Sequence, residues 1–173
     1  MKYFFGIIFI LITSCSGTKR PSSHGDDALP PPHINCPEDG NCSFEVFKES
    51  NLKLAYDSSG KLFPDIIKGD KIVIKYHYKR RKIENTADSD YSEYVYFEVD
   101  PNKKQVILKD SELQQVKMIF GRICYCKGSM GYFPIKEGSL FLFNSNGNLQ
   151  VKTSFKIHKV PQIIEQIDEN IKF

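Results

Sequence analysis

The sequence predicts a mainly β fold, either an antiparallel β-sandwich or a small barrel, with one or two short helices. Two observations predict it. Short segments alternate apolar and polar side chains with a period of two, as half-buried strands do. Turn-forming Asp, Asn, Gly and Pro residues separate these segments. A series of short strands joined by turns is typical of a sandwich or a barrel.

The first half of the domain contains five predicted strands. Residues 42–47 and 52–56 form a predicted hairpin with each other. The clearest alternation follows at 72–79, with Ile and Tyr on one face and Lys and His on the other. Further strands are predicted at 93–99 and, after a turn, at 105–108. The last three segments together predict an antiparallel meander.

A short helix is predicted at 111–119, because Ser111 and Gln114 have the spacing of a capping box and the apolar residues after them have helical spacing. The next strands are predicted at 122–127, 132–136, 139–143 and 149–158. Pro161 can then open a final helix. That helix would carry an apolar stripe formed by Ile163, Ile164, Ile167 and Ile171. A strand is the competing prediction for this last segment.

Residues 36–173 have the length of one β-rich domain. Lys and Arg outnumber Asp and Glu by only 24 to 21. A nucleic-acid binder would carry a strongly basic face, so this balance predicts no nucleic-acid partner. Residues 15–35 are rich in Pro and Ser and have few apolar side chains, which predicts a flexible tether. About twenty residues reach roughly 65 Å when fully extended.

The first fifteen residues have the layout of a secretory signal. Lys2 supplies a positive charge, residues 3–12 are almost all apolar, and Ile12-Thr13-Ser14-Cys15 closes the segment. An apolar run of about ten residues is too short for a membrane-spanning helix, which needs about twenty. A plain secretory signal and an uncleaved anchor are the alternatives.

The closing tetrapeptide resembles the lipobox of bacterial lipoproteins. This resemblance implies that residues 1–14 are a signal peptide and that Cys15 becomes the mature N-terminus. Cys15 would carry fatty acyl chains such as palmitate, which anchor the protein to a membrane. Ser16 follows it instead of Asp, which by the same resemblance predicts an outer-membrane anchor facing the periplasm. The block 121–138 is similar to an element of uncharacterised Bacteroidetes envelope lipoproteins, and it implies no function.

Four further cysteines, Cys36, Cys42, Cys124 and Cys126, predict disulfides in an exported chain. Cys124 and Cys126 are two apart on a predicted strand, where Cα atoms roughly 6.5 to 7 Å apart are at the limit for a bridge. We therefore predict that Cys36 and Cys42 each pair with Cys124 or Cys126. Loops of about 80 to 90 residues would then contribute roughly 4 kcal/mol each. A single Cys36–Cys42 bridge is the simpler alternative.

The same four cysteines allow two functional alternatives. Four thiolates could hold Zn²⁺ or Cu(I), because soft sulfur ligands select those ions. The spacings Cys36-x5-Cys42 and Cys124-x-Cys126 nevertheless match zinc sites poorly. Cys-x-Cys could also act as a redox pair, although the spacing of two residues and the helix N-terminus that such pairs use are missing.

The only dense basic run, 79–82, precedes an acidic stretch that contains Asp88, Asp90 and Glu93. A long, charge-balanced and solvated hairpin loop is the prediction for this segment. Docking on an acidic partner, a lipid headgroup or a glycan is the alternative.

His77 and His158 are predicted to lie on strands as polar residues rather than as ligands. Five aromatic residues surround the Cys124–Cys126 segment and are predicted to be core; exposed together they would form a binding patch. They are Tyr125, Tyr132, Phe133, Phe141 and Phe143.

The sequence contains no motif that pairs a nucleophile with a base, no phosphate loop and no dinucleotide fingerprint. The leading hypothesis is a lipid-anchored, non-enzymatic envelope protein without a cofactor, which binds an envelope protein or glycan or supports an assembly. A periplasmic Zn- or Cu-binding lipoprotein that uses Cys36, Cys42, Cys124 and Cys126 is the alternative. A hydrolase with a cryptic site is the third class.

Overall fold

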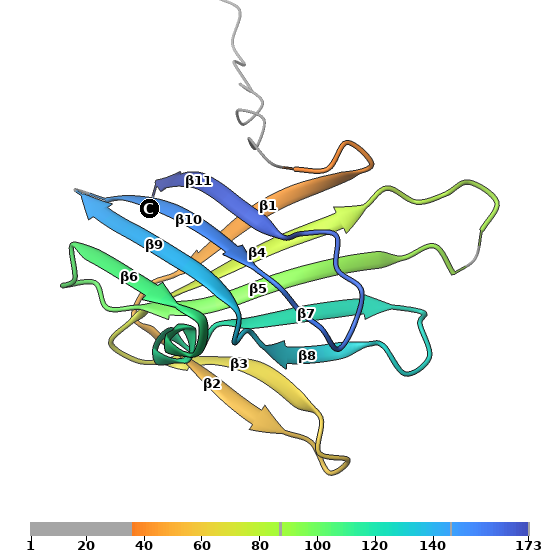
Figure 1. Ribbon diagram of the computed structural model, residues 1–173, viewed down its shortest axis with the longest axis horizontal. Helices are drawn as coiled ribbons and strands as arrows, with labels where there is room; N and C mark the ends of the chain where they lie inside the picture. Colours follow the sequence, from red (N-terminus) through yellow and green to blue (C-terminus); the bar gives the residue numbers. More distant parts are fainter. Residues whose placement is uncertain (1–35, 87, 146, 173) are drawn as a thin grey trace, which may run out of the picture. The chain divides into compact units, whose positions relative to one another are not determined.

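The computed structural model describes residues 36–86, 88–145 and 147–172 (Figure 1). These residues form eleven strands and one short helix, which confirms the mainly β class. The sheets are antiparallel and open, as in a β-sandwich, and do not close into a barrel. No helix of the described residues is long and apolar enough to cross a membrane.

Sheet 1 has five strands, in the spatial order β1 (Gly40–Phe47), β4 (Ile72–Arg80), β5 (Tyr91–Val99), β7 (Ile119–Cys124) and β8 (Gly131–Pro134). Sheet 2 has four strands, in the order β11 (Gln166–Lys172), β10 (Asn148–Phe155), β9 (Gly138–Ser145) and β6 (Gln105–Lys109). A separate hairpin pairs β2 (Ser50–Tyr56) with β3 (Leu62–Lys68).

The main core combines alternate side chains of sheet 1 with alternate side chains of sheet 2. Its central members include Ile74, Tyr76, Tyr78, Val95, Phe97, Leu140, Leu142, Leu149 and Val151. A second cluster, with Leu52 and Leu62 of the β2–β3 hairpin, covers Val73, Tyr96 and Ile119 on the other face of sheet 1. Part of sheet 1 is therefore buried on both faces.

The first predicted helix is a 3₁₀ helix, η1 (Asp110–Val116). The hydrogen bond at its N-terminus joins Lys109 and Glu112, whereas the predicted capping box joined Ser111 and Gln114. The carboxylate of Glu112 accepts a hydrogen bond from the backbone N–H of Lys109 (3.0 Å). The amide of Gln114 instead donates to two backbone carbonyl oxygens, at 2.9 and 2.7 Å.

The predicted final helix is wrong, and the competing strand prediction is confirmed. Residues 166–172 form β11, which pairs with β10 along its whole length. Ile167 and Ile171 are buried on one face of that strand, and Ile164 is buried in the loop before it. In this arrangement the backbone groups of β10 find hydrogen-bond partners on β11. A helix would have left that edge of sheet 2 without partners.

The predicted hairpin between residues 42–47 and 52–56 is also wrong. β1 pairs with β4, whereas β2 pairs with β3, which the sequence did not predict as a strand. Pro64 in the middle of β3 hides that strand, because Pro removes a backbone donor from the ladder. A two-stranded hairpin tolerates it, because the N–H side of an edge strand needs no partner.

Candidate binding site

Two disulfides join Cys36 to Cys42 and Cys124 to Cys126, with Cα–Cα distances of 5.7 and 5.2 Å. Disulfides are confirmed, but the predicted bridges between the two pairs are wrong. β7 ends at Cys124 and the chain bends at Tyr125, so the Cα atoms come closer than on an extended strand. In this oxidised form the four sulfurs offer no thiolate to a metal. Within the described residues, no group of three or more His, Cys, Asp or Glu side chains could hold a metal ion.

The disulfides close short loops, so their stabilising effect is smaller than predicted. In the chain-entropy model, loops of this size contribute about 2 kcal/mol each instead of roughly 4 kcal/mol. Neither bond joins sheet 1 to sheet 2. The disulfides therefore fix local turns, and packing and hydrogen bonds hold the two sheets together.

Both disulfides lie at the same end of sheet 1. Gly40 pairs with Arg80 and Tyr91 pairs with Cys124, so the segment 36–39, the described residues of the β4–β5 loop (81–86 and 88–90) and the β7–β8 loop (125–130) are neighbours. We call these three segments the loop end. It lies on the right in Figure 1, opposite the tip of β9.

A carboxylate, Glu93, is completely buried beside the loop end. It accepts hydrogen bonds from the backbone N–H groups of Ile163 and Ile164, both at 2.7 Å, and from the hydroxyl of Tyr91 at 2.5 Å. Burial raises the pKa of Glu93, and these hydrogen bonds oppose that shift. The sequence had placed Glu93 opposite the basic run, whereas its partners come from Tyr91 and the β10–β11 loop.

A buried arginine extends this network. Nε of Arg122 donates to the Tyr91 hydroxyl at 3.2 Å. One terminal nitrogen of Arg122 donates to the carbonyl oxygen of Ser129 at 2.9 Å and to its hydroxyl at 2.7 Å. Burial and the bond to Glu93 raise the pKa of Tyr91 to about 12, so its hydroxyl remains a donor at neutral pH. The network thus connects β5, β7, the β7–β8 loop and the β10–β11 loop.

The β10–β11 loop, residues 156–165, is fixed a second time by Gln162. The side-chain oxygen of Gln162 accepts a hydrogen bond from the N–H of Ile157 at 2.5 Å. Its side-chain nitrogen donates to the carbonyl oxygens of Phe155 (3.1 Å) and Ile164 (2.9 Å). The loop therefore has a defined conformation although it contains no regular secondary structure.

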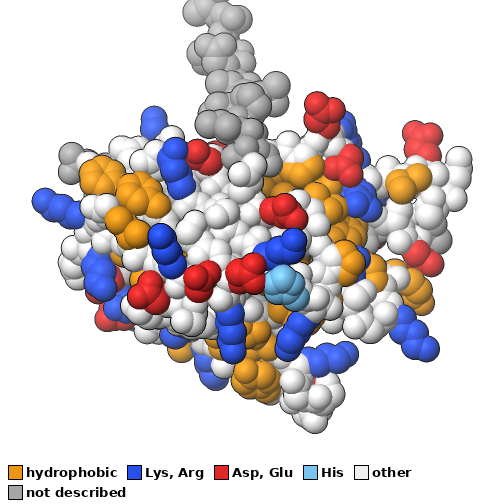
Figure 2. Space-filling model, in the orientation of Figure 1, with side chains coloured by type: hydrophobic (Ala, Val, Ile, Leu, Met, Phe, Trp, Pro, Cys, Tyr) orange, Lys and Arg blue, Asp and Glu red, His pale blue; other side chains and the backbone are white. Residues whose placement is uncertain are grey.

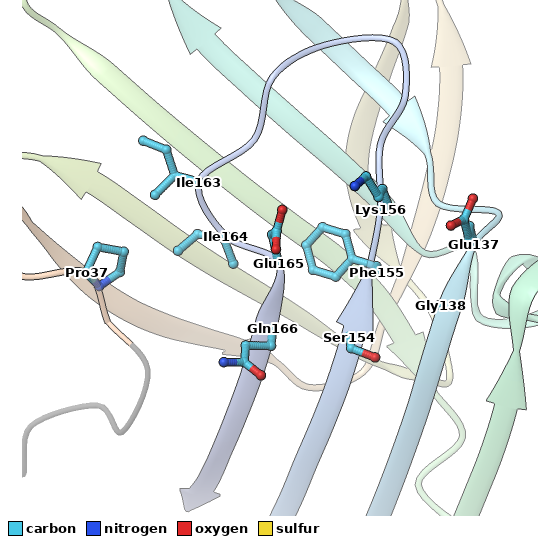
Figure 3. A pocket seen from close by; sticks show the side chains of 10 residues that line it. All are labelled: Pro37, Glu137, Gly138, Ser154, Phe155, Lys156, Ile163, Ile164, Glu165 and Gln166. Carbon is cyan, nitrogen blue, oxygen red and sulfur yellow. The ribbon is translucent and has the colours of Figure 1, made fainter.

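A cavity of about 540 Å³ lies beside this loop (Figure 3). Its lining comes from the β10–β11 loop, the adjoining ends of β9, β10 and β11, and Pro37. The lining combines apolar side chains with acidic, basic, amide and hydroxyl groups. These residues are Pro37, Glu137, Gly138, Ser154, Phe155, Lys156, Ile163, Ile164, Glu165 and Gln166. Such a mixture suits a ligand with both apolar and hydrogen-bonding parts.

The two histidines of the domain occupy different environments. His158 lies beyond the end of β10, and its Nε2 is 2.6 Å from the carboxylate of Glu137 at the rim of the cavity. Both of these side chains are more than half exposed, so the pair is worth little energetically. His77 lies on β4, as predicted, and stacks on Tyr94 with ring centroids 4.4 Å apart. Burial and the neighbouring Lys75 lower the pKa of His77.

The aromatic residues near the second disulfide do not all belong to the core. Tyr125 is 83% exposed and Phe143 is 44% exposed. Phe133 packs against the main core and Tyr132 against the second cluster, both half-buried. Tyr125 lines two hollows of about 360 and 400 Å³. The prediction that these aromatic residues belong to the core is therefore wrong for Tyr125.

The predicted charge-balanced hairpin loop is confirmed only in part. Lys79 and Arg80 are the last residues of β4, and Glu93 is buried on β5, so only the rest of the two charged stretches belongs to the loop. Lys82 Nζ lies 3.4 Å from the carboxylate of Asp90 across the β4–β5 loop. Nε of Arg80 lies 3.3 Å from the carboxylate of Asp39, and the guanidinium lies over the Tyr91 ring at 4.6 Å. Each of these two cations therefore lies beside a carboxylate.

We predict that Glu93→Gln lowers the free energy of unfolding by about 2 to 3 kcal/mol, because the amide nitrogen would face a buried backbone N–H and leave it unpaired. Urea denaturation followed by circular dichroism measures the change. Glu165→Gln alters an exposed carboxylate in the same loop and should stay within about 0.5 kcal/mol of the unchanged protein. Equal stability of both variants would contradict the role given to Glu93.

We also predict that the oxidised protein contains the Cys36–Cys42 and Cys124–Cys126 bonds and no others among these four residues. Cleavage after Arg122 and Lys127 should release a peptide whose mass is lower by two hydrogens than after reduction. Alkylation should label these cysteines only after reduction. The double variant Cys124→Ser/Cys126→Ser should keep the Cys36–Cys42 bond. A peptide that joins Cys36 to Cys124 or Cys126, or thiols released by a chelator, would disprove the assignment.

Comparisons with known proteins give no further assignment. No family model, no curated protein and no solved structure matches this chain. Its function has to be argued from the residues and the geometry described above.

Proposed function

We propose that this protein is a lipid-anchored module of the bacterial cell envelope, which binds another envelope component through the cavity beside the β10–β11 loop. The observation that carries the proposal is the oxidised state of all four described cysteines. Disulfides form and persist in secreted and periplasmic proteins and are rare in the cytosol. Oxidised cysteines therefore agree with the signal-like segment at the start of the sequence.

The anchor in this proposal is Cys15. The signal peptide 1–14, Cys15 and the tether 15–35 all lie outside the described residues. Two or three acyl chains on one residue would hold the protein stably at a membrane, because each buried methylene adds about 0.8 kcal/mol. Ser16 favours the outer membrane, with the domain in the periplasm.

The binding role rests on the cavity and on the rigidity of its wall. The Phe155 ring and the side chains of Ile163 and Ile164 supply apolar surface, while Lys156 and Glu165 supply charges of both signs. A peptide segment of an envelope protein offers matching groups. Because Glu93 and Gln162 already hold the loop, little conformational entropy is lost when a partner binds.

The anchor is tested by the mass of the mature protein. The expected N-terminus is Cys15 carrying acyl chains, and the protein should incorporate a labelled fatty acid and sediment with membranes. Cys15→Ser, the matched control, should lose both the label and the membrane association. A mature protein with an intact Met1, or with an N-terminus that bears no fatty acid, would refute the anchor.

The binding role is tested with a photoreactive amino acid in intact cells. At Glu165, on the cavity wall, it should give one discrete cross-linked product. At Asn170, exposed towards the other end of β11, the same group should give none. The variant Ile163→Lys should weaken the product at Glu165, because the lysine side chain introduces a charge into the apolar part of the cavity. Identical product patterns at the two positions would argue against a specific site.

A further inference from the structure

Tyr125 is the most exposed of the large apolar side chains in the described part of the chain, at 83%. It is the single residue between Cys124 and Cys126, which are bonded to each other. This small ring holds Tyr125 in a bend beyond the end of β7. An exposed Tyr whose backbone is already held by its two neighbours is suited to binding, because it loses little conformational entropy when it is bound.

Two isoleucines extend the apolar surface around Tyr125. Ile123 is 36% exposed and lines one of the two hollows next to Tyr125, and Ile83 is 59% exposed and lines the other. Acidic and basic side chains occur together at the loop end, on the right in Figure 2, and one ion pair there joins Lys82 to Asp90. The surface therefore offers apolar contact without a strong net charge.

The chain outside the structure enters the domain at this same place. The first described residue, Cys36, belongs to the loop end, and the N–H of Arg81 donates to the carbonyl oxygen of Asp39 at 2.9 Å. The β4–β5 loop that carries Ile83 is thus bonded to the entering segment. About twenty residues separate Cys15 from Cys36, and they reach at most roughly 65 Å.

We propose that the loop end docks on the membrane to which the protein is anchored, with Tyr125 at the headgroup level and Ile83 and Ile123 beside it. This inference rests on the proposed lipid anchor. Tyr is enriched at membrane–water interfaces because its ring is apolar and its hydroxyl is polar. Since acidic and basic residues balance around it, the contact depends on apolar insertion, and a zwitterionic membrane is sufficient.

The absence of Trp from the sequence makes a direct test available. Tyr125→Trp places a single Trp at the tip. The full-length acylated variant is reconstituted into phosphatidylcholine vesicles with or without brominated acyl chains. Docking predicts that bromine lowers Trp fluorescence about twofold or more, because the indole lies at the interface. The result should not change when phosphatidylglycerol or high salt is added.

Phe143→Trp is the matched control, since it replaces an exposed aromatic residue near the tip of β9, away from the loop end (Figure 1). Its fluorescence should be the same in both kinds of vesicle. Ile83→Trp is a second reporter, in a different loop, and should be quenched like Tyr125→Trp. Circular dichroism verifies that each variant is folded.

The outcomes separate this inference from the proposed function. Flotation with vesicles but no quenching at either Tyr125→Trp or Ile83→Trp overturns the docking and leaves the anchor in place. Equal quenching at Phe143→Trp also overturns it, because the contact would not be specific to the loop end. Failure to float, together with a protein mass that lacks acyl chains, overturns both.

Discussion

The hydrogen bonding of the buried carboxylate of Glu93 is the interaction on which the arrangement of the β10–β11 loop depends. A charge removed from water is costly unless hydrogen bonds compensate it. Three donors surround Glu93, and two of them are backbone N–H groups of the β10–β11 loop. That requirement fixes the loop against β5. It also connects sheet 1 with the chain that leads into the edge strand of sheet 2, which the two disulfides do not do.

The core and the network make different contributions. The apolar core between the sheets is extensive and would tolerate some rearrangement, because hydrophobic burial is not directional. The bonds of Glu93, Tyr91 and Arg122 have fixed lengths and directions, so they select one conformation of the loops. The cavity of the candidate site inherits its shape from that selection, since Ile163 and Ile164 form part of its wall.

Alternation identified the strands at 72–79 and 93–99, because residues two apart share a face whatever the partner strand is. The segment 163–171 was ambiguous for a related reason. Isoleucines four residues apart lie on one side of a helix and equally on one face of a strand. The segment forms a strand because β10 offers an edge for it to pair with, which the sequence pattern alone does not reveal. Glu93 was assigned to the solvated loop, although its spacing of two and four residues from the inward-facing Val95 and Phe97 was a signal for a buried charge. The cavity had no such signal, because Pro37, Glu137 and the β10–β11 loop are far apart in the sequence.

The disulfide prediction failed because it assumed an extended chain past Cys124. The bonds that form instead have an additional consequence for how the protein matures. Each cysteine meets its partner within a few residues, so pairing can be complete while most of the chain is still unstructured. An enzyme that oxidises the cysteines would need access only to the few residues that contain each pair. A bridge from Cys36 to Cys124 or Cys126 would have required Cys36 to stay reduced until roughly ninety more residues had been made.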